Sequence, residues 1–177
     1  MIRRDVLKFG GVATAGLLVA GPLAAVDLRK DRRLALIDAR FAEARAFGAA
    51  ARASGARVVA TDQDILSLWH GALRGTSLAG LTGLTTYADM IVIAGLAAEA
   101  RRPFALRIAH QRHAGRVTHD VVDGASGCLP VLAAAADQWP VGAWTILTGA
   151  MAAPALAAAP MRKPFTQGGA LWSWGIA

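Results

Sequence analysis

The sequence contains only one cysteine, Cys128, among its 177 residues. A single cysteine excludes an intramolecular disulfide, and it excludes the cysteine sets that hold iron–sulfur clusters or structural zinc. The C-x-x-C-H motif that attaches covalent haem is also absent. The sequence leaves the cofactor undetermined, with one divalent or transition metal held by other side chains as the candidate.

Standard catalytic and nucleotide-binding signatures are missing as well. After the first expected strand, Ala39-Arg40-Phe41 lacks the glycines of a G-x-G-x-x-G loop, so no classical dinucleotide site is predicted. The segment 124–128 places Ser126 between small residues but does not form a G-x-S-x-G elbow. The sequence thus leaves open whether the protein is an enzyme.

Strong clustering of positive charge is also lacking, although the net charge is +7. Arginines are scattered and do not alternate with aromatic residues, so no nucleic-acid partner is predicted. The exception is Arg29-Lys30-Asp31-Arg32-Arg33, in residues 26–33. We interpret 26–33 as a basic, solvated linker, with contact to anionic lipid headgroups as the alternative.

The first 25 residues carry a recognisable pattern. Paired arginines, Arg3-Arg4, stand before Leu7 and Lys8, and an uncharged run follows from Phe9 to Val26. This arrangement resembles a bacterial twin-arginine (Tat) export signal, although Val6 and Ile2 replace the usual Phe and Ser or Thr. The resemblance implies that the Tat export machinery carries the folded protein to the periplasm.

The fate of this signal is open from the sequence. The run from Phe9 to Val26 has eighteen residues, which is the lower limit for crossing a bilayer, and its glycines and Pro22 weaken a helix. Cleavage after Ala24 or Ala25 is one outcome, and an uncleaved tether to the inner membrane is the other.

The 152 residues that follow the signal suffice for one domain, which we assign to 34–177. Strand 34–38, helix 41–54 and strand 57–61 follow one another closely, with Gly55 after the helix. This order predicts a βαβ unit with parallel strands. We therefore expect a compact α/β domain with a mixed sheet, in two or three layers.

The remaining elements are expected as follows. A helix at 62–73 and a glycine-punctuated loop at 75–83 precede a helix from Thr85 or Thr86 to about Arg102, in which 90–93 has strand as an alternative. Strands are predicted at 104–113, 116–123 and 170–176, helices at 129–136 and 144–151, and an Ala/Pro-rich loop at 152–164. In the last strand, Trp172 and Trp174 share one face, as core residues or as an aromatic surface for a partner.

Polar residues follow the first two strands. Because parallel strands end on the same side of a sheet, Asp38, Arg40, Asp62 and Asp64 are expected near one another and near Thr61. They are candidates for binding a divalent cation or the hydroxyls of a small ligand. The alternative is structural: helix capping by the later aspartates and an ion pair between Asp38 and an arginine.

Three of the four histidines, at 110, 113 and 119, lie within ten residues. A two-residue turn at Ala114-Gly115 pairs His110 with His119 on one face of a hairpin. The pair could bind a metal with Asp123 or Cys128, or transfer protons. A three-residue loop instead separates the histidines onto opposite faces and leaves a polar hairpin tip.

Two functions from different classes follow. The resemblance to an export signal, together with the absence of catalytic signatures, favours a periplasmic accessory or binding protein that acts with a co-exported protein subunit. The alternative is a small metal-dependent enzyme that uses His110 and His119. A small-molecule sensor built on the carboxylates after the first two strands is a third possibility.

Overall fold

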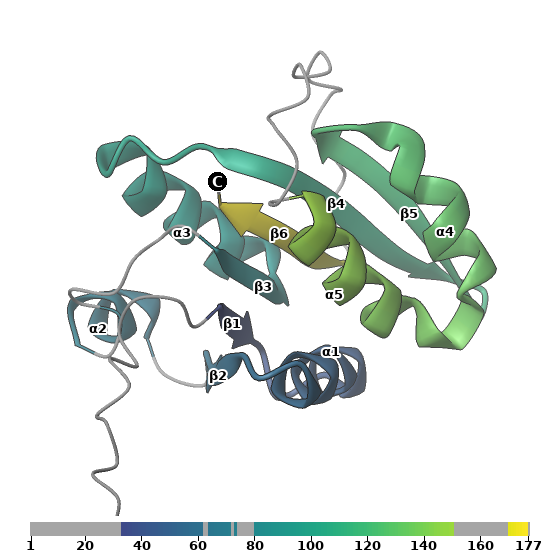
Figure 1. Ribbon diagram of the computed structural model, residues 1–177, viewed down its shortest axis with the longest axis horizontal. Coiled ribbons are helices and arrows are strands. Elements are labelled where there is room, and N and C mark those ends of the chain that lie inside the picture. The colour runs from purple at the N-terminus through teal and green to yellow at the C-terminus, as the bar shows by residue number, and fades with distance from the viewer. Residues whose placement is uncertain (1–32, 62–63, 72, 74–79, 151–169, 177) are drawn as a thin grey trace, which may run out of the picture.

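The computed structural model describes residues 33–61, 64–71, 73, 80–150 and 170–176. Its centre is a six-stranded sheet in the order β2-β1-β3-β6-β4-β5 (Figure 1). The strands are β1 (Leu34–Ile37), β2 (Arg57–Ala60), β3 (Leu81–Thr86), β4 (Phe104–His113), β5 (Arg116–Asp123) and β6 (Leu171–Ile176). The α-helices are α1 (Ala42–Ala53), α2 (Ile65–His70), α3 (Tyr87–Glu99), α4 (Leu129–Ala134) and α5 (Trp139–Ala150).

The sheet has a parallel half and an antiparallel half. Strands β2, β1 and β3 run parallel to one another. Strand β6 pairs antiparallel with β3 on one side and with β4 on the other, and β4 pairs antiparallel with β5. The chain is therefore an α/β protein with a mixed sheet, as the sequence predicts.

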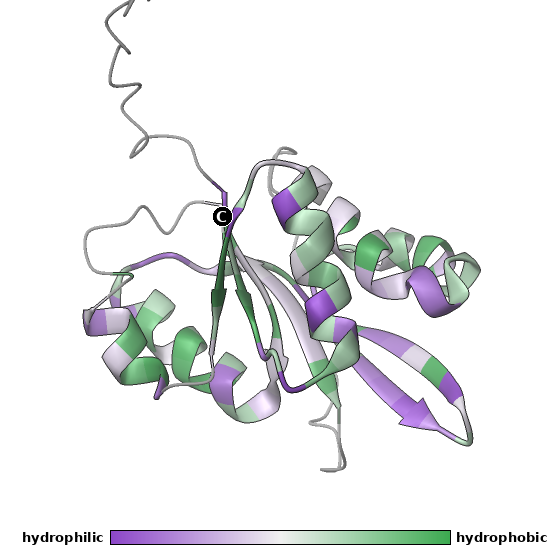
Figure 2. Ribbon diagram, turned by 90° about the horizontal axis from the view of Figure 1, so that it is seen from below, coloured by the Kyte–Doolittle hydropathy of each residue, from purple (hydrophilic) through white to green (hydrophobic). Residues whose placement is uncertain are grey.

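Helices cover both faces of the sheet (Figures 1 and 2). One core joins the sheet to α1, α4 and α5 through residues such as Phe47, Leu132 and Leu147. The other joins the opposite face to α2 and α3 through residues such as Leu68 and Ile93. Of the two sequence alternatives, the three-layer arrangement is the one observed.

The predicted βαβ unit is confirmed. Helix α1 buries Ala44, Phe47, Gly48 and Ala51, which are spaced to form one face of a helix. Gly55 ends the connection in the left-handed region with φ 84°, which glycine adopts without a steric cost. Local sequence signals were sufficient here because every element of this unit is adjacent in the chain.

The predicted loop at 75–83 is wrong in its second part, where strand β3 begins at Leu81. Gly83 lies inside this strand because the indole of Trp174 occupies the space of a side chain: a Cβ would stand 2.2 Å from Trp174 Cζ2. Glycine is therefore required at this position by close packing against Trp174, and it does not indicate a loop.

Several helix boundaries also differ from the predictions. Helix α2 spans only Ile65–His70, and α5 begins at Trp139 instead of Trp144. Met90–Ile93 is helical, within α3, and the strand alternative is wrong. Thr86 caps α3, since its hydroxyl accepts a hydrogen bond from the Asp89 backbone N–H at 3.3 Å.

The hairpin of β4 and β5 has the predicted two-residue turn. Ala114 and Gly115 both have positive φ, 46° and 78°, as a type I′ turn requires. The register pairs His113 with Arg116 and His110 with His119. The three-residue alternative is therefore wrong, although alanine is unusual in this turn. The outer part of the hairpin is largely hydrophilic (Figure 2).

Some predictions concern residues outside the described ranges. They are the export signal at 1–25, the linker at 26–33 except for Arg33, Asp62 and the loop at 152–164. Within the described ranges, no helix combines the length and the apolar character that a bilayer crossing requires.

Candidate functional site

The two predicted histidines form a buried hydrogen-bonded chain with a serine. His110 Nδ1 lies 2.7 Å from His119 Nδ1, and His110 Nε2 lies 2.7 Å from Ser173 Oγ. The chain thus joins β5, β4 and β6 across one face of the sheet. Trp139, the first residue of α5, stacks on the His110 ring with a centroid distance of 4.2 Å. Both nitrogens of His110 are therefore engaged.

Burial makes His110 a neutral imidazole. Removal from water lowers the pKa of His110 well below its usual value, and the neighbouring His119 lowers it further. Burial also lowers the pKa of the half-buried His119, while nearby Asp120 opposes the shift. Since the two Nδ1 atoms face each other, a hydrogen bond between them requires that one carries a proton and donates it to the other.

This geometry suits a shared proton better than a shared metal. Two imidazole nitrogens bound to one tetrahedral zinc at about 2.0–2.1 Å stand about 3.3 Å apart, farther than the 2.7 Å observed. The chain can pass a proton between His119, which is partly accessible, and Ser173, which is completely buried. Because Ser173 is completely buried, a substrate could reach Ser173 Oγ only after displacement of the residues that cover it.

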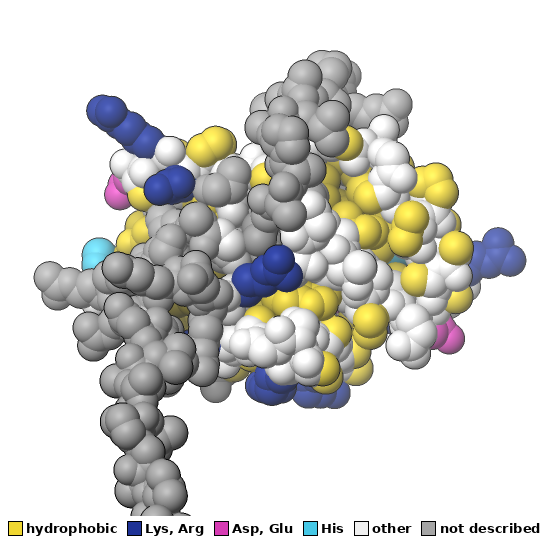
Figure 3. Space-filling model, in the orientation of Figure 1, with side chains coloured by type: hydrophobic (Ala, Val, Ile, Leu, Met, Phe, Trp, Pro, Cys, Tyr) yellow, Lys and Arg dark blue, Asp and Glu magenta, His cyan; other side chains and the backbone are white. Residues whose placement is uncertain are grey.

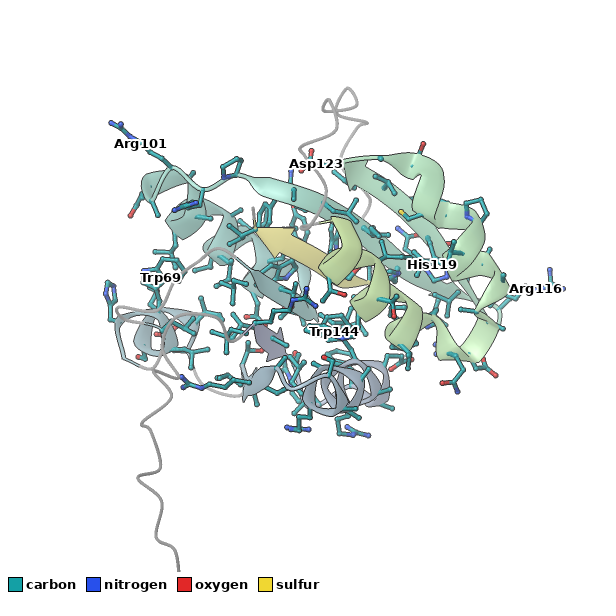
Figure 4. The ribbon with its side chains drawn as sticks, in the orientation of Figure 1. Trp69, Arg101, Arg116, His119, Asp123 and Trp144 are labelled. Atoms are coloured by element: carbon teal, nitrogen blue, oxygen red, sulfur yellow. The ribbon has the colours of Figure 1, made fainter. Side chains whose placement is uncertain are left out.

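The structure does not bring Asp123 to the histidine pair. Its carboxylate forms an ion pair with Arg107, whose guanidinium contacts Met90 of α3 on the opposite face of the sheet. A register shift between Arg107 and Ile108 leaves Val122 as an extra residue, which breaks the regular alternation after His119. Figure 4 shows His119 and Asp123 at separate places along β5.

Other candidate metal ligands are also occupied elsewhere. The Cys128 thiol is partly buried and donates to the Ala125 carbonyl at 3.4 Å, and burial raises its pKa. His113 is exposed near the tip of the hairpin. In the ranges that the structure describes, no group of three or more His, Cys, Asp or Glu is arranged to hold a metal ion.

The second predicted site lies at the carboxyl ends of the parallel strands. Here β1 lies between β2 and β3, with α1 on one face of the sheet and α2 and α3 on the other. The order in which strands are added to the sheet therefore reverses between β1 and β3. Ligands of open α/β sheets bind at such switch points. Asp38 is buried there, directly after β1.

Asp38 is committed to Arg40. It accepts hydrogen bonds from Arg40 Nε at 2.9 Å, Nη2 at 2.6 Å and the backbone N–H at 3.1 Å. These bonds lower the pKa of Asp38 despite the opposing effect of burial. The pair therefore neutralises its own charge, which matches the structural alternative given above.

Of the other residues predicted at this site, one caps a helix and one forms a contact that the sequence did not indicate. Asp64 caps α2 by accepting from the Ser67 backbone N–H at 3.0 Å. Thr61 donates instead to Asp89 of α3, at 3.3 Å between Oγ1 and Oδ2. Asp89 thus takes the place expected for Asp64 as the second carboxylate described at this edge.

Comparisons with known proteins add no relative. The chain matches no family model, no curated protein and no solved structure. Its function is therefore argued from the chemistry of its own residues.

Sequence reasoning missed Ser173 and Trp139 as partners of the histidines. A signal for Ser173 was present, since it is the one hydroxyl in an otherwise apolar strand, Leu171–Ile176. A buried hydroxyl needs a hydrogen-bond partner. No local signal indicated that this partner is His110, which lies 63 residues away in the chain.

A third feature is the outer surface of α4 and α5. Residues 129–150 contain one charged side chain, Asp137. Val131 is 55% exposed and Val141 is 38% exposed. We define the α4–α5 surface by its exposed residues: Pro130, Val131, Ala133, Ala134, Val141, Thr145 and Gly149. Hydrophobic side chains gather over these two helices in Figure 3.

Proposed function

We propose that this protein is an exported periplasmic accessory protein that binds a co-exported protein subunit through the α4–α5 surface. The observation that carries the proposal is that no exposed residue of α4 or α5 is charged, since Asp137 lies in the connection between the two helices. Interface cores are depleted in charged residues, because burying an ion costs free energy that burying a methyl group does not. The partner is accordingly expected to offer an apolar surface of its own.

Helix α1 differs from α4 and α5 because its exposed side is charged. Its solvent side carries Arg45 and Arg52, both exposed, beside the partly exposed Glu43. Helix α1 thus has the usual division into an apolar and a charged side, while α4 and α5 do not. The two helical surfaces cover the same core, so burial within the chain does not explain the difference.

The histidine chain supports this choice over catalysis. Ser173 and His110 are buried and satisfy each other, which is what a structural polar network requires. The resemblance of residues 1–25 to a twin-arginine signal supports export after folding. A folded accessory protein that leaves the cytoplasm with its partner fits both observations.

Site-specific photo-crosslinking in the native cell envelope tests the proposal. A photoreactive residue at position 131 or 141 is expected to give one crosslinked product with one exported protein. The same residue at Arg52 of α1 provides the matched control and should give none. The purified partner should then bind the wild-type protein and lose about tenfold or more in affinity with Val141→Asp.

Ala49→Asp adds the same charge to the exposed side of α1 and should leave binding unchanged. Equal crosslinking from α1 and α5 would refute the α4–α5 surface as the binding site. A purified monomer that binds one equivalent of zinc, iron or copper through His110 and His119, and turns over a substrate, would refute the accessory function itself.

A further inference from the structure

We infer that the free edge of β5 pairs with β5 of a second copy of this chain, in antiparallel orientation around a two-fold axis at Thr118. The pairing joins the sheets of the two copies into one continuous sheet. It uses the backbone edge of β5 and not the outer surface of α4 and α5, so the inference is independent of the proposed partner subunit.

The two edges of the sheet differ in length. Strand β2 forms one edge and has four residues, while β5 forms the other and has eight. Natural sheets protect an edge by keeping it short, by proline or lysine, or by a cover. Strand β5 contains no proline or lysine, and none of its residues is buried. Its backbone forms no hydrogen bond with a described element other than β4, so this edge can accept another strand.

The turn of the hairpin determines which backbone groups point to the free edge. His113 and Arg116 flank a two-residue turn and therefore form a hydrogen-bonded pair, and such pairs alternate along the two strands. Every second residue of β5, counted from Arg116, bonds to β4. The residues between them point their N–H and C=O groups outward: Val117, His119 and Val121. These groups can bond only to a new strand.

The side chains of β5 alternate as well, and one set is available to a second strand. Val117 packs against the core beneath α4 and α5, and His119 contacts the first residue of α5. Arg116, Thr118 and Asp120 therefore lie on the opposite face of the sheet. Arg116 and Thr118 are exposed, and Asp120 is partly exposed.

Two charges on this set lack an ion-pair partner within the described part of the chain. Neither Arg116 nor Asp120 forms a salt bridge there. Figure 4 shows Arg116 extending away from the domain, and Figure 2 shows the outer part of the hairpin projecting from it. A second strand can therefore approach both residues and supply the opposite charge to each.

Two independent conditions select the same register. Residues with outward backbone groups must stand opposite one another, so the two-fold axis must pass through a residue and not between two residues. With the axis at Thr118, Val117 stands opposite His119 of the second copy, and Arg116 stands opposite Asp120 of the second copy. An axis at Asp120 opposes two carboxylates, and an axis at His119 leaves Arg116 without a carboxylate opposite.

The edge is thus complementary to itself, which selects a second copy over an unrelated strand. In this register Arg116 and Asp120 stand at positions that are not hydrogen-bonded to the new strand, where opposite Cβ atoms are closest. The two Thr118 side chains face each other at the axis. Opposite charges and threonine pairs at such positions stabilise a sheet.

The expected dimer is weak because the contact is short. It spans Arg116–Asp120 in each copy, so it buries less than the roughly 800 Å² per partner of a standard interface. We therefore expect a dissociation constant in the range of about 10–100 μM.

Sedimentation equilibrium over a concentration series tests this inference on the full chain. The wild-type protein is expected to change from monomer to dimer as its concentration rises. Arg116→Asp and Asp120→Arg should each raise the dissociation constant about tenfold or more, because each puts like charges opposite one another. The variant with both substitutions restores opposite charges and should dimerise like the wild-type protein.

Two further variants separate the edge from general effects of charge and folding. Arg57→Asp makes the same charge change at the exposed start of β2, on the other edge, and should leave the dissociation constant unchanged. Val117→Pro removes an outward N–H without removing a hydrogen bond to β4. It should weaken the dimer about tenfold or more while the monomer still unfolds in one cooperative transition.

Disulfide crosslinking in a Cys128→Ser background tests the position of the axis. Thr118→Cys should form a disulfide-linked dimer, since opposite Cβ atoms at the axis stand about 4.5–5.5 Å apart. His113→Cys, near the exposed hairpin tip, should not. A monomer at every concentration would overturn the inference, as would a dimer that neither single charge variant weakens. Crosslinking of Thr118→Cys only to another exported protein would refute the second copy and assign the edge to a strand of that protein.

Discussion

The parallel and antiparallel halves of the sheet handle polar residues in different ways. In the parallel half, Asp38 and Thr61 follow β1 and β2, and buried threonines inside a strand, Thr82 and Thr85, occur only in β3 at the junction with the antiparallel half. In the antiparallel half, His110, His119 and Ser173 lie inside their strands. A polar group at the end of a strand can turn to water or cap a helix. One in the middle must find its partner on the neighbouring strand.

This difference determines whether water can replace a lost hydrogen-bond partner. The hydrogen bond of Thr61 to Asp89 lies at the carboxyl ends of the strands, where Thr61 is buried and Asp89 is partly exposed. The bond of His110 to Ser173 is completely enclosed, so its loss leaves a buried nitrogen without a partner. The strongest consequences of mutation are therefore expected within the antiparallel half and at its junction with β3.

The largest effect is expected at this junction, from Gly83→Ala. The added Cβ would stand 2.2 Å from Trp174 Cζ2, and the buried indole also donates to Thr85 Oγ1 at 3.0 Å. Moving the ring should cost about 3 kcal/mol in the free energy of unfolding, measured by urea denaturation. Gly95→Ala is the matched control and should be neutral or stabilising. If Gly83→Ala had the stability of the wild-type protein, the packing of Trp174 against β3 would be shown to be loose.

A smaller loss is expected from Ser173→Ala. It removes the partner of His110 Nε2 in a site closed to water, which should cost about 2 kcal/mol. Thr61→Val in the parallel half removes a 3.3 Å hydrogen bond at the sheet edge and should cost about 0.5 kcal/mol. Chemical denaturation of both variants compares the two halves directly. Equal losses would remove the distinction between them.

Thr86→Ala tests the cap that joins β3 to α3. Losing the hydroxyl that accepts from the Asp89 N–H should lower the free energy of unfolding by about 1 kcal/mol. Thr86→Ser keeps the acceptor and should retain most of the stability. If both variants lose the same amount, the threonine methyl contributes more than the cap.

The loss of folding stability at low pH is expected to arise from the histidines of the antiparallel half. The pKa of His110 and of His119 is lower in the folded state than the usual 6.5, so the unfolded chain binds more protons below that pH. Stability should be full above about pH 6.5 and fall as the pH decreases towards 5. The midpoint of thermal unfolding, followed across this range at constant ionic strength, measures the effect.

The matched control for the pH experiment is His113→Ala, which removes an exposed histidine near the hairpin tip. It should keep the full pH dependence of the wild-type protein. His110→Leu combined with Ser173→Ala removes both enclosed polar groups and should reduce that dependence. A pH profile identical to that of the wild type would show that the histidine chain does not control acid stability.

The hairpin shows how far sequence reasoning reached. Counting outward from Ala114-Gly115 predicted the pairing of His110 with His119, because the length of a turn sets the register of the strands it joins. The same counting failed for Asp123, since the extra residue Val122 interrupts the alternation. A bulge depends on how the strand packs and carries no clear signal in this segment.

The αβ elements near the start of the domain were also predictable, while β3 was not. Its residues, Leu81–Thr86, include three threonines, and Gly83 among them is one of the glycines that made 75–83 resemble a loop. They form a central strand because β1 and β6 supply hydrogen bonds on both sides and Trp174 fills the space above the glycine.

The sequence by itself determined the α/β class, the first βαβ unit and the register of the hairpin, because periodicity, caps and turn length act over short distances. Only the tertiary structure decided that β6 enters between β3 and β4. That insertion brings Ser173 to His110 across 63 residues and makes a candidate metal pair into an enclosed hydrogen-bonded chain. Such a contact depends on which strands become neighbours, and strand order follows from burying both faces of the sheet at once.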